Sequence, residues 1–481
     1  MKILFASSEC VPFIKTGGLA DVVGALPKEL VKSGADVRVI LPLYKTMNQK
    51  WKDQLEYLFD FNIRLGWRSQ YVGIHTLVND GIRFYFIDNE QYFGRDYIYG
   101  SGTDEGERYA YFCRAVLEAL PKLNFMPDIL HANDWQTGMI PALLKLQYNR
   151  LELYSCIHTV YTIHNLKFQG QYDPFVLGDI LGLMGTPAEP QLLTYKDGRR
   201  ESVNYMQGAV CYADRITTVS PTYAEEIRMP YYGENLDWLF RKRSDVLSGI
   251  LNGIDTKDLD PAADVALPYH YDLSDLSGKA KDKKELQKEL GLAVDPCVPV
   301  YAIISRLTEQ KGLDLVTYIL PEIEKRSMQL VILGVGDAKY EEAFRYYGDK
   351  NPGKICAKLC FDEGLSRRIY AGADALLVPS RFEPCGLTQM MAMRYGTLPI
   401  VRETGGLKDT VEPYNEYEGT GTGFSFANFN AGELLSAIDL SLTVYGKKKA
   451  WNSLRIQAMQ KDLSWRQSAK AYRKLYKELT S

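Results

Sequence analysis

Several loops that follow short apolar runs carry residue types able to bind an anion. The first is KTGGLAD, at residues 15–21. Its glycines let backbone N–H groups approach an anion at the start of a helix, and Lys15 can add a full positive charge. The spacing matches neither a P-loop nor the GxGxxG fingerprint of dinucleotide-binding proteins. For this loop alone, a turn with a surface lysine is the simpler interpretation.

The most informative loop is SRFEPCGLT, at residues 380–388. It lies between a predicted strand at 375–379 and a predicted helix at 389–395, and it places the carboxylate of Glu383 beside the free N–H donors of a helix start. This combination suits a ligand that has both hydroxyl groups and phosphates. Cys385 could have a lowered pKa at a helix start, but a supporting role is favoured over a nucleophilic one.

Three more motifs follow predicted strands. SRLTEQKG, at 305–312, carries the cations Arg306 and Lys311 in a loop before a helix. TIHN, at 162–165, places His164 at a strand end, where a structural histidine is the ordinary alternative. LGVGD, at 333–337, resembles half of a dinucleotide fingerprint and fits a tight turn equally well.

These loops need a parallel sheet to bring them together, and the chain alternates apolar runs with amphipathic stretches as βα units do. We expect an α/β protein of two doubly wound, Rossmann-like domains facing across a cleft, with ligands at the carboxyl ends of the strands. The predicted domains are 1–248 plus 464–481, and 249–463. The predicted strands are 2–6, 36–41, 71–77, 83–87, 128–132, 160–164, 215–219, 298–305, 330–334, 355–359, 375–379 and 398–401, and the predicted helices include 20–32, 108–120 and 137–148.

Two further helices are predicted from pattern. The charged stretch 279–290 is interpreted as a solvated helix, in preference to a basic binding patch. At the C-terminus, Ser464 and Gln467 have the spacing of a capping box. The apolar residues that follow share one helical face, so this helix needs a partner and is expected to cross back to the first domain; they are Trp465, Ala469, Tyr472, Tyr476 and Leu479.

Composition excludes several classes of protein. The 57 basic and 60 acidic residues give a net charge of −3, a poor match for a partner such as nucleic acid or an anionic membrane. Eight cysteines without a CxxC pair indicate buried free thiols in a reducing compartment. We expect no signal peptide, because the apolar run at the N-terminus is too short, and no apolar run of about 18 residues occurs in the sequence. We therefore expect a cytoplasmic protein; the sequence does not indicate its oligomeric state.

With these motifs in order, the chain resembles the glycogen and starch synthase family of retaining GT-B glycosyltransferases. The resemblance runs from about residue 1 to the C-terminus, and we expect no plastid leader, which points to the bacterial branch. The matching motifs are KTGGLADV (15–22), HANDW (131–135), TIHN (162–165), TVSPTYAEEI (218–227), LNGID (251–255), SRLTEQKG (305–312), PSRFEPCGLTQ (379–389) and TGGLKDTV (404–411).

The resemblance implies an enzyme that transfers glucose with retention from ADP-glucose to the non-reducing end of an α-1,4-glucan such as glycogen. It implies a catalytic set of His164, Glu383, Arg306, Lys311 and Asp21, with the two cations neutralising the donor diphosphate and Glu383 holding glucose hydroxyls. His164 lies where the family places a main-chain carbonyl near the anomeric carbon. The implied donor-binding residues are Lys15, Gly18, Asn165, Asn252, Phe361, Cys385, Gly386, Leu387 and Thr388.

On the acceptor side the resemblance implies Asp134, Trp135 and Tyr99, and Asp21 and Asp134 either line that side or support its loops. It implies no cofactor and no metal. Two departures stand out: Phe361 replaces the family's tyrosine as the adenine-stacking aromatic, and Met391 stands where many relatives of this fold have a second glutamate. The DxD at 258–260 mimics a metal motif, but we interpret it as a turn.

Three alternative functions are compatible with parts of the sequence. The nearest is a transferase of the same fold that uses UDP-glucose or another acceptor. A dinucleotide oxidoreductase lacks its GxGxxG. A non-catalytic glucan-binding protein is suggested by the 33 tyrosines, but the joint presence of Lys15, His164, Arg306, Lys311 and Glu383 argues against it.

Overall fold

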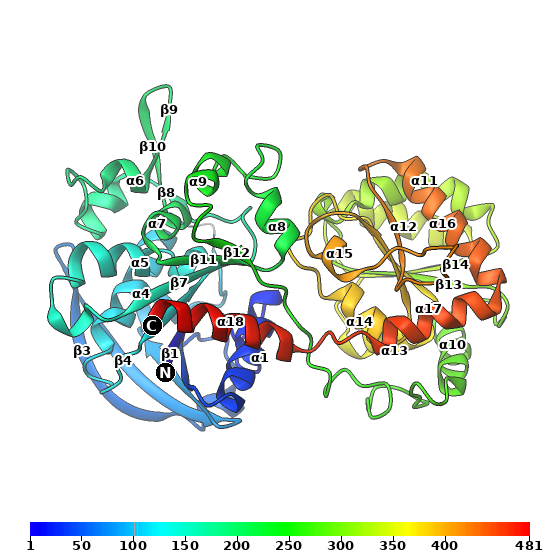
Figure 1. The fold of residues 1–481 in the computed structure, drawn as a ribbon, viewed down its shortest axis with the longest axis horizontal. Helices are drawn as coiled ribbons and strands as arrows, with labels where there is room; N and C mark the ends of the chain where they lie inside the picture. The colour runs from blue at the N-terminus through cyan, green and yellow to red at the C-terminus, as the bar shows by residue number, and fades with distance from the viewer. Residues whose placement is uncertain (101, 103) are drawn as a thin grey trace. The chain divides into compact units, whose positions relative to one another are not determined.

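The computed structural model describes residues 1–100, 102 and 104–481, and the chain divides into two compact units. The first unit comprises Met1–Val219, Ala224–Ile250 and Trp465–Ser481, and the second comprises Ser220–Tyr223 and Leu251–Ser464. Figure 1 traces the chain through both. The C-terminal helix belongs to the first unit, as the sequence predicts.

The first unit is built on a nine-stranded sheet in the order β12-β11-β7-β6-β1-β2-β5-β4-β3. The strands from β12 to β5 are parallel, whereas β4 and β3 are added antiparallel at one edge. Their bounds are β1 Lys2–Ala6, β2 Asp36–Pro42, β3 Glu56–Leu65, β4 Arg68–Asn79, β5 Ile82–Asp88, β6 Ile129–Asn133, β7 His158–Ile163, β11 Arg215–Thr218 and β12 Leu247–Gly249. From β1 the chain adds β2 and the strands beyond it on one side, and then returns to add β6, β7, β11 and β12 on the other side. The loops after β1 and β6 therefore flank a topological switch point.

Helices cover this sheet because their apolar residues recur at helical spacing. In α1 the buried positions include Leu19, Val22, Val23, Leu26 and Leu30. The helices of the first unit are α1 Gly18–Lys32, α2 Gln49–Lys52, α3 Glu90–Phe93, α4 Glu105–Ala119, α5 Met139–Leu143, α6 Glu189–Leu192, α7 Tyr205–Tyr212, α9 Asp237–Lys242 and α18 Trp465–Thr480; α8, Pro221–Glu226, spans the boundary between the units. The predicted helix at 137–148 is α5 continued by the π-helix Leu144–Tyr148.

The terminal helix α18 lies beside α1 (Figure 1), with its apolar face in the core of the first unit. Trp465, Ala469, Tyr472 and Tyr476 are buried there. The Tyr476 hydroxyl is 2.6 Å from Nδ1 of His131 on β6, whose Nε2 is 2.6 Å from the Thr162 hydroxyl on β7. A buried polar chain therefore joins α18 to two central strands.

A small antiparallel sheet is inserted in the first unit in the order β8-β10-β9. Its strands are β8 Gln171–Tyr172, β9 Leu193–Lys196 and β10 Arg199–Asn204. The β9–β10 hairpin projects from the unit in Figure 1. Neither this sheet nor the antiparallel strand β3 is predicted from the sequence.

The second unit has a parallel six-stranded sheet in the order β15-β14-β13-β16-β17-β18. Because β13 and β16 lie side by side while the chain runs outward from β13 through β14 and β15, the loops after β13 and β16 flank the switch point of this unit. The strands are β13 Val300–Ile304, β14 Gln329–Leu333, β15 Ile355–Lys358, β16 Ala375–Val378, β17 Leu398–Arg402 and β18 Phe424–Phe426. The helices are α10 Ser277–Glu289, α11 Leu313–Glu324, α12 Ala338–Lys350, α13 Glu363–Gly372, α14 Thr388–Arg394, α15 Gly405–Thr410, α16 Ala431–Gly446 and α17 Lys448–Gln460.

The prediction that 279–290 forms a solvated helix is wrong in one respect. The helix exists as α10, but Lys279 and Lys283 are buried. Lys279 Nζ donates to the Ala371 carbonyl at the end of α13 (2.8 Å), and Lys283 Nζ pairs with the Asp374 carboxylate (2.8 Å). Burial of these cations is possible because each finds polar partners inside the unit.

All eight cysteines are free, but only Cys10, Cys113 and Cys385 are buried, so the expectation of generally buried thiols is too broad. The DxD aspartates pair with arginines, Asp258 with Arg367 and Asp260 with Arg394. In the part of the chain that the structure describes, no helix has the length and apolarity needed to cross a bilayer.

Candidate active site

In the second unit, the loops after β13 and β16 bring Lys311 and Glu383 together. Lys311 Nζ lies 2.7 Å from Glu383 Oε2, which also accepts a hydrogen bond from the Ser380 hydroxyl (2.8 Å). The loops can approach because Gly312 has a φ of 70° and a Cβ there would lie 1.9 Å from the Pro379 carbonyl oxygen. Glu383 is only 6% exposed, so its charge is held in place by a cation and a hydroxyl.

The remaining predicted residues of the second unit lie around this pair at the same edge of the sheet. Arg306 follows β13 and is exposed, and none of the described carboxylates forms an ion pair with it. Phe361 follows β15 and is 87% exposed, so a ring face is available for stacking. Gly386, Leu387 and Thr388 form the start of α14, whose first turn has no side-chain cap among the described residues.

The Cys385 thiol is buried, and burial raises its pKa to about 12. The suggestion of a lowered pKa at this helix start is therefore wrong, because desolvation outweighs the helix terminus. The Asn252 backbone N–H donates to this sulfur. The Asn252 side-chain oxygen is buried and has no hydrogen-bond partner within the described residues, which leaves one acceptor available to a ligand.

The glycines of LGVGD have a structural explanation. A Cβ at Gly334 would lie 1.9 Å from the Ser305 carbonyl oxygen, and one at Gly336 would lie 2.2 Å from that of Leu307. The Leu307 N–H donates to the Val335 carbonyl (2.8 Å). This loop therefore packs against the loop that carries Arg306, and that packing accounts for both glycines.

In the first unit, the predicted residues follow β1, β6 and β7. Lys15, Gly18 and Asp21 lie in the loop after β1 and at the start of α1, and Lys15 Nζ is 2.7 Å from Asp21 Oδ1. A predicted cation is thus paired with a predicted acid. Among the described residues, no side chain caps the first turn of α1.

After β6 and β7, two residues hold His164. The Asp134 carboxylate accepts from the His164 backbone N–H (2.8 Å), and His164 Nε2 is 3.0 Å from the Asn133 side-chain oxygen. Because the Asn133 amide nitrogen donates to the carbonyls of Ala6 and His131, its oxygen must accept, and Nε2 of His164 carries the hydrogen. Asn133 was not predicted as a site residue, although it stands inside the HANDW motif.

Burial determines the protonation of His164 and Asp134. It lowers the pKa of His164 to about 3, so the imidazole is neutral at ordinary pH. It raises the pKa of Asp134 to about 7, against hydrogen bonds from the His164 and Asn165 backbone and with a smaller contribution from the negative charge of Glu9. Asp134 also has a φ of 55°, an uncommon conformation for an aspartate. The Asn165 side-chain oxygen accepts from the Lys167 N–H (3.1 Å) and shapes the next turn.

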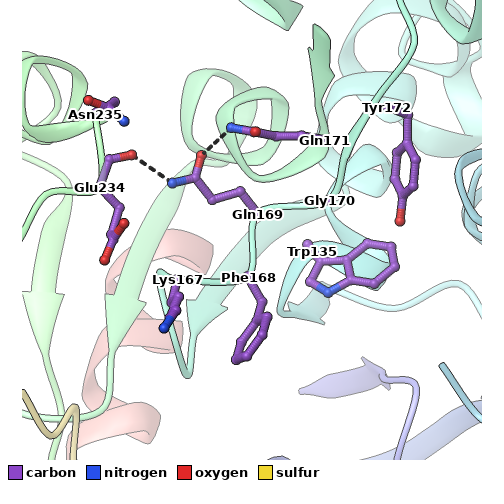
Figure 2. A pocket seen from close by; sticks show the side chains of 9 residues that line it. All are labelled: Trp135, Lys167, Phe168, Gln169, Gly170, Gln171, Tyr172, Glu234 and Asn235. Carbon is purple, nitrogen blue, oxygen red and sulfur yellow. Dashed lines mark hydrogen bonds between the residues drawn. The ribbon is translucent and has the colours of Figure 1, made fainter. Parts of the chain in front are cut away.

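A cavity of about 400 Å³ opens beside Trp135. Figure 2 shows its lining, in which Gln169 donates to the Glu234 carbonyl (2.8 Å) and accepts from Gln171 (3.2 Å). Trp135 and Tyr172 have ring centroids 5.8 Å apart, and Phe168 is half exposed. The nine lining residues are Trp135, Lys167, Phe168, Gln169, Gly170, Gln171, Tyr172, Glu234 and Asn235. Aromatic faces beside amides suit a sugar, and of this lining only Trp135 was predicted.

Tyr99 lies between α3 and α4 and reaches the loop after β1. Its hydroxyl donates to the Glu9 carboxylate and is 2.8 Å from the Ser8 hydroxyl. Within the described residues, no group of three or more His, Cys, Asp or Glu side chains is arranged to hold a metal.

Comparisons with known proteins agree with this arrangement. Residues 2–242 match the family model "Starch synthase catalytic domain", and residues 282–453 match "Glycosyl transferases group 1". A curated glycogen synthase of Streptococcus sanguinis is 51% identical over 480 residues, covering 100% of both chains. One from Clostridium perfringens is 49% identical over 479 residues, covering 100% of this chain and 98% of the relative.

Solved structures agree as well. The catalytic domain of starch synthase IV from Arabidopsis thaliana, bound to ADP and acarbose, matches with a TM-score of 0.90 and 32% identity, covering 100% of this chain and 99% of that one. Sucrose-phosphate synthase from Thermosynechococcus elongatus, at 17% identity and a TM-score of 0.62, shares the fold alone. The two doubly wound units, the motifs at their strand ends and these full-length matches establish that the chain belongs to the glycogen and starch synthase family of glycosyltransferases.

Proposed function

We propose that this chain is a glycogen synthase that transfers glucose, with retention at the anomeric carbon, from ADP-glucose to the non-reducing end of an α-1,4-glucan. The observation that carries the proposal is the Lys311–Glu383 pair with Arg306 at the switch point of the second unit. It combines charges for a diphosphate with a carboxylate for sugar hydroxyls. Relatives about half identical over their whole length are glycogen synthases, and a solved relative binds ADP and acarbose.

On the donor side, Arg306 and Lys311 stabilise the diphosphate as it leaves, since negative charge grows there in the transition state. The N–H groups of Gly386, Leu387 and Thr388 bind the distal phosphate. In the first unit, Lys15 and Gly18 are the proposed donor-binding residues. The Glu383 carboxylate and the unpartnered oxygen of Asn252 accept hydrogen bonds from glucose hydroxyls. The exposed ring of Phe361 stacks on adenine.

On the acceptor side, the cavity beside Trp135 holds the end of the glucan. Its aromatic rings offer stacking faces, and its amides offer hydrogen bonds to hydroxyls. Asp134 and Asn133 fix His164, so that its neutral ring and its backbone carbonyl present a constant surface to the sugar. Asp21 orients Lys15 through their ion pair, and Tyr99 supports the same loop through Glu9.

We assign no covalent nucleophile. The Cys385 thiol is protonated at ordinary pH because burial raises its pKa. The Glu383 carboxylate is engaged by Lys311 and Ser380. Retention then follows from attack on the face that the diphosphate leaves, with a donor phosphate oxygen taking the proton of the acceptor hydroxyl. We also propose that no metal ion is required, because the two cations and the helix start supply the counter-charge.

The test is transfer of radioactive glucose to glycogen from ADP-[14C]glucose and, in parallel, from UDP-[14C]glucose. We expect ethanol-precipitable counts chiefly from the ADP donor. Equal kcat/KM for the two donors would support the alternative, a transferase of the same fold with another donor preference. An absence of precipitable counts with both donors would refute the proposed activity.

A further inference from the structure

Glu9 is a buried carboxylate in the first unit that the motifs do not include and that has no direct contact with substrate in the proposed function. It follows β1 and is 3% exposed. One oxygen accepts from the Thr16 hydroxyl (2.6 Å) and from the Tyr99 hydroxyl. The other accepts from the backbone N–H groups of Thr16 and Gly17, the latter at 3.2 Å.

These four donors nearly exhaust the capacity of a carboxylate, which accepts about four hydrogen bonds and donates none when ionised. Glu9 therefore has little capacity left for a substrate and acts on its neighbours. It accepts hydrogen bonds from two successive backbone N–H groups, those of Thr16 and Gly17. These residues belong to the loop that carries Lys15 and leads into α1 at Gly18. The buried Glu9 carboxylate therefore determines the conformation of this loop.

The same carboxylate joins two segments that are far apart in the sequence. Tyr99 lies 90 residues from Glu9, and its hydroxyl is also 2.8 Å from the Ser8 hydroxyl. On the other side of Thr16, Lys15 is paired with Asp21 at 2.7 Å. The hydrogen bonds to Glu9 and the ion pair with Asp21 therefore hold Lys15 and the start of α1 in one geometry.

We propose that Glu9 is a positioning residue for the transfer reaction, which fixes the 15–18 loop so that the Lys15 ammonium meets the donor diphosphate in a productive geometry. The inference rests on the proposed function. Displacement of such groups by about 1 Å can cost roughly a hundredfold in rate. Charge and acceptor capacity are both essential: a glutamine at this position would turn an NH₂ group toward donors.

The experiment compares the wild-type enzyme, Glu9→Gln, Lys15→Ala and the double variant, with kcat and KM for ADP-glucose measured at saturating glycogen. We expect Glu9→Gln to lower kcat by about 10- to 100-fold. The matched control is Glu189→Gln in the same unit, where a buried glutamate accepts from the Gly185 N–H (2.7 Å) and pairs with Arg200. The control should retain wild-type kcat.

The double variant separates positioning from a general structural role. If Glu9 acts through the Lys15 loop, Glu9→Gln should cost less than about threefold in the Lys15→Ala background, because the group that it positions is gone. Multiplicative losses, or wild-type kcat in Glu9→Gln, would overturn the inference. Because the wild-type enzyme is assayed first, failure of the proposed function would appear there, as an absence of glucan synthesis.

Thr16→Val supplies a second variant in case Glu9→Gln does not fold. It removes the hydroxyl that donates to Glu9 at 2.6 Å and keeps the backbone N–H. We expect a smaller loss of kcat with an unchanged melting temperature, again suppressed in the Lys15→Ala background. An unchanged kcat in Thr16→Val, or a loss of kcat that persists in full in the Lys15→Ala background, contradicts the inference.

Discussion

Replacement of Lys311 by alanine tests the donor site most sharply. The Lys311 ammonium is 2.7 Å from the Glu383 carboxylate, and the two side chains are 21% and 8% exposed. In the variant, Glu383 keeps the Ser380 hydroxyl at 2.8 Å as a donor but loses its cation. The substitution therefore affects both the stability of the second unit and the chemistry.

The two effects appear in different measurements. A buried carboxylate left short of a partner costs about 1–3 kcal/mol of folding free energy. In the reaction, a missing positive charge at the leaving diphosphate costs about 3 kcal/mol, which is roughly a hundredfold in kcat. Since this charge is needed chiefly in the transition state, donor KM should change far less than kcat.

The assay measures initial rates over a range of ADP-glucose at saturating glycogen, together with thermal unfolding. Lys350→Ala is the control, because it removes another ion pair of the second unit, with Glu324 at 2.9 Å, on a helix that carries no site residue. It should keep wild-type kinetics. A raised KM with kcat intact in Lys311→Ala would show that the lysine contributes only to ground-state binding and would refute the assigned role.

Three further outcomes are expected. Phe361→Ala should raise the KM for ADP-glucose by about two- to tenfold, since stacking is worth about 0.5–1.5 kcal/mol, and an unchanged KM would exclude stacking by this ring. Dialysis against EDTA should leave the rate unchanged, whereas a loss restored by Mg²⁺ would contradict the metal-free proposal. Asp134 has a pKa of about 7 against an ordinary 3.8, so its contribution to stability is present below about pH 4 and is lost as pH rises through 7. Asp134→Asn should therefore flatten the fall in unfolding free energy between about pH 4 and 7, and an unchanged slope in chemical denaturation would count against this shift.

The sequence predicts what depends on local pattern. The strand at 2–6 is found as β1, Lys2–Ala6, because a continuous apolar run before a glycine loop is typical of a central parallel strand. The proximity of Lys311 and Glu383 follows from parallel strand ends meeting at one edge. The buried face of α18 is predicted by the helical spacing of its apolar residues.

Features that depend on distant partners were not predictable. The sequence predicts that Lys279 and Lys283 are solvated, whereas their burial is explained by distant partners such as Ala371 and Asp374, about 90 residues away. Glu9 carries no motif signature because one of its donors, Tyr99, lies 90 residues along the chain. For Cys385, the helix start is visible in the sequence, but the burial that raises the pKa of its thiol is a property of the packed unit.

The most direct measurement of the central claim is the structure of the reaction product. ADP-[1-13C]glucose and maltotetraose are incubated with the enzyme, and the new glucosyl unit is examined by NMR and by digestion with β-amylase. The account predicts maltopentaose that carries the label in its non-reducing unit, with an α-anomeric signal and an α-1,4 linkage. A β-anomeric signal, another linkage, or release of free labelled glucose as the main product would contradict it.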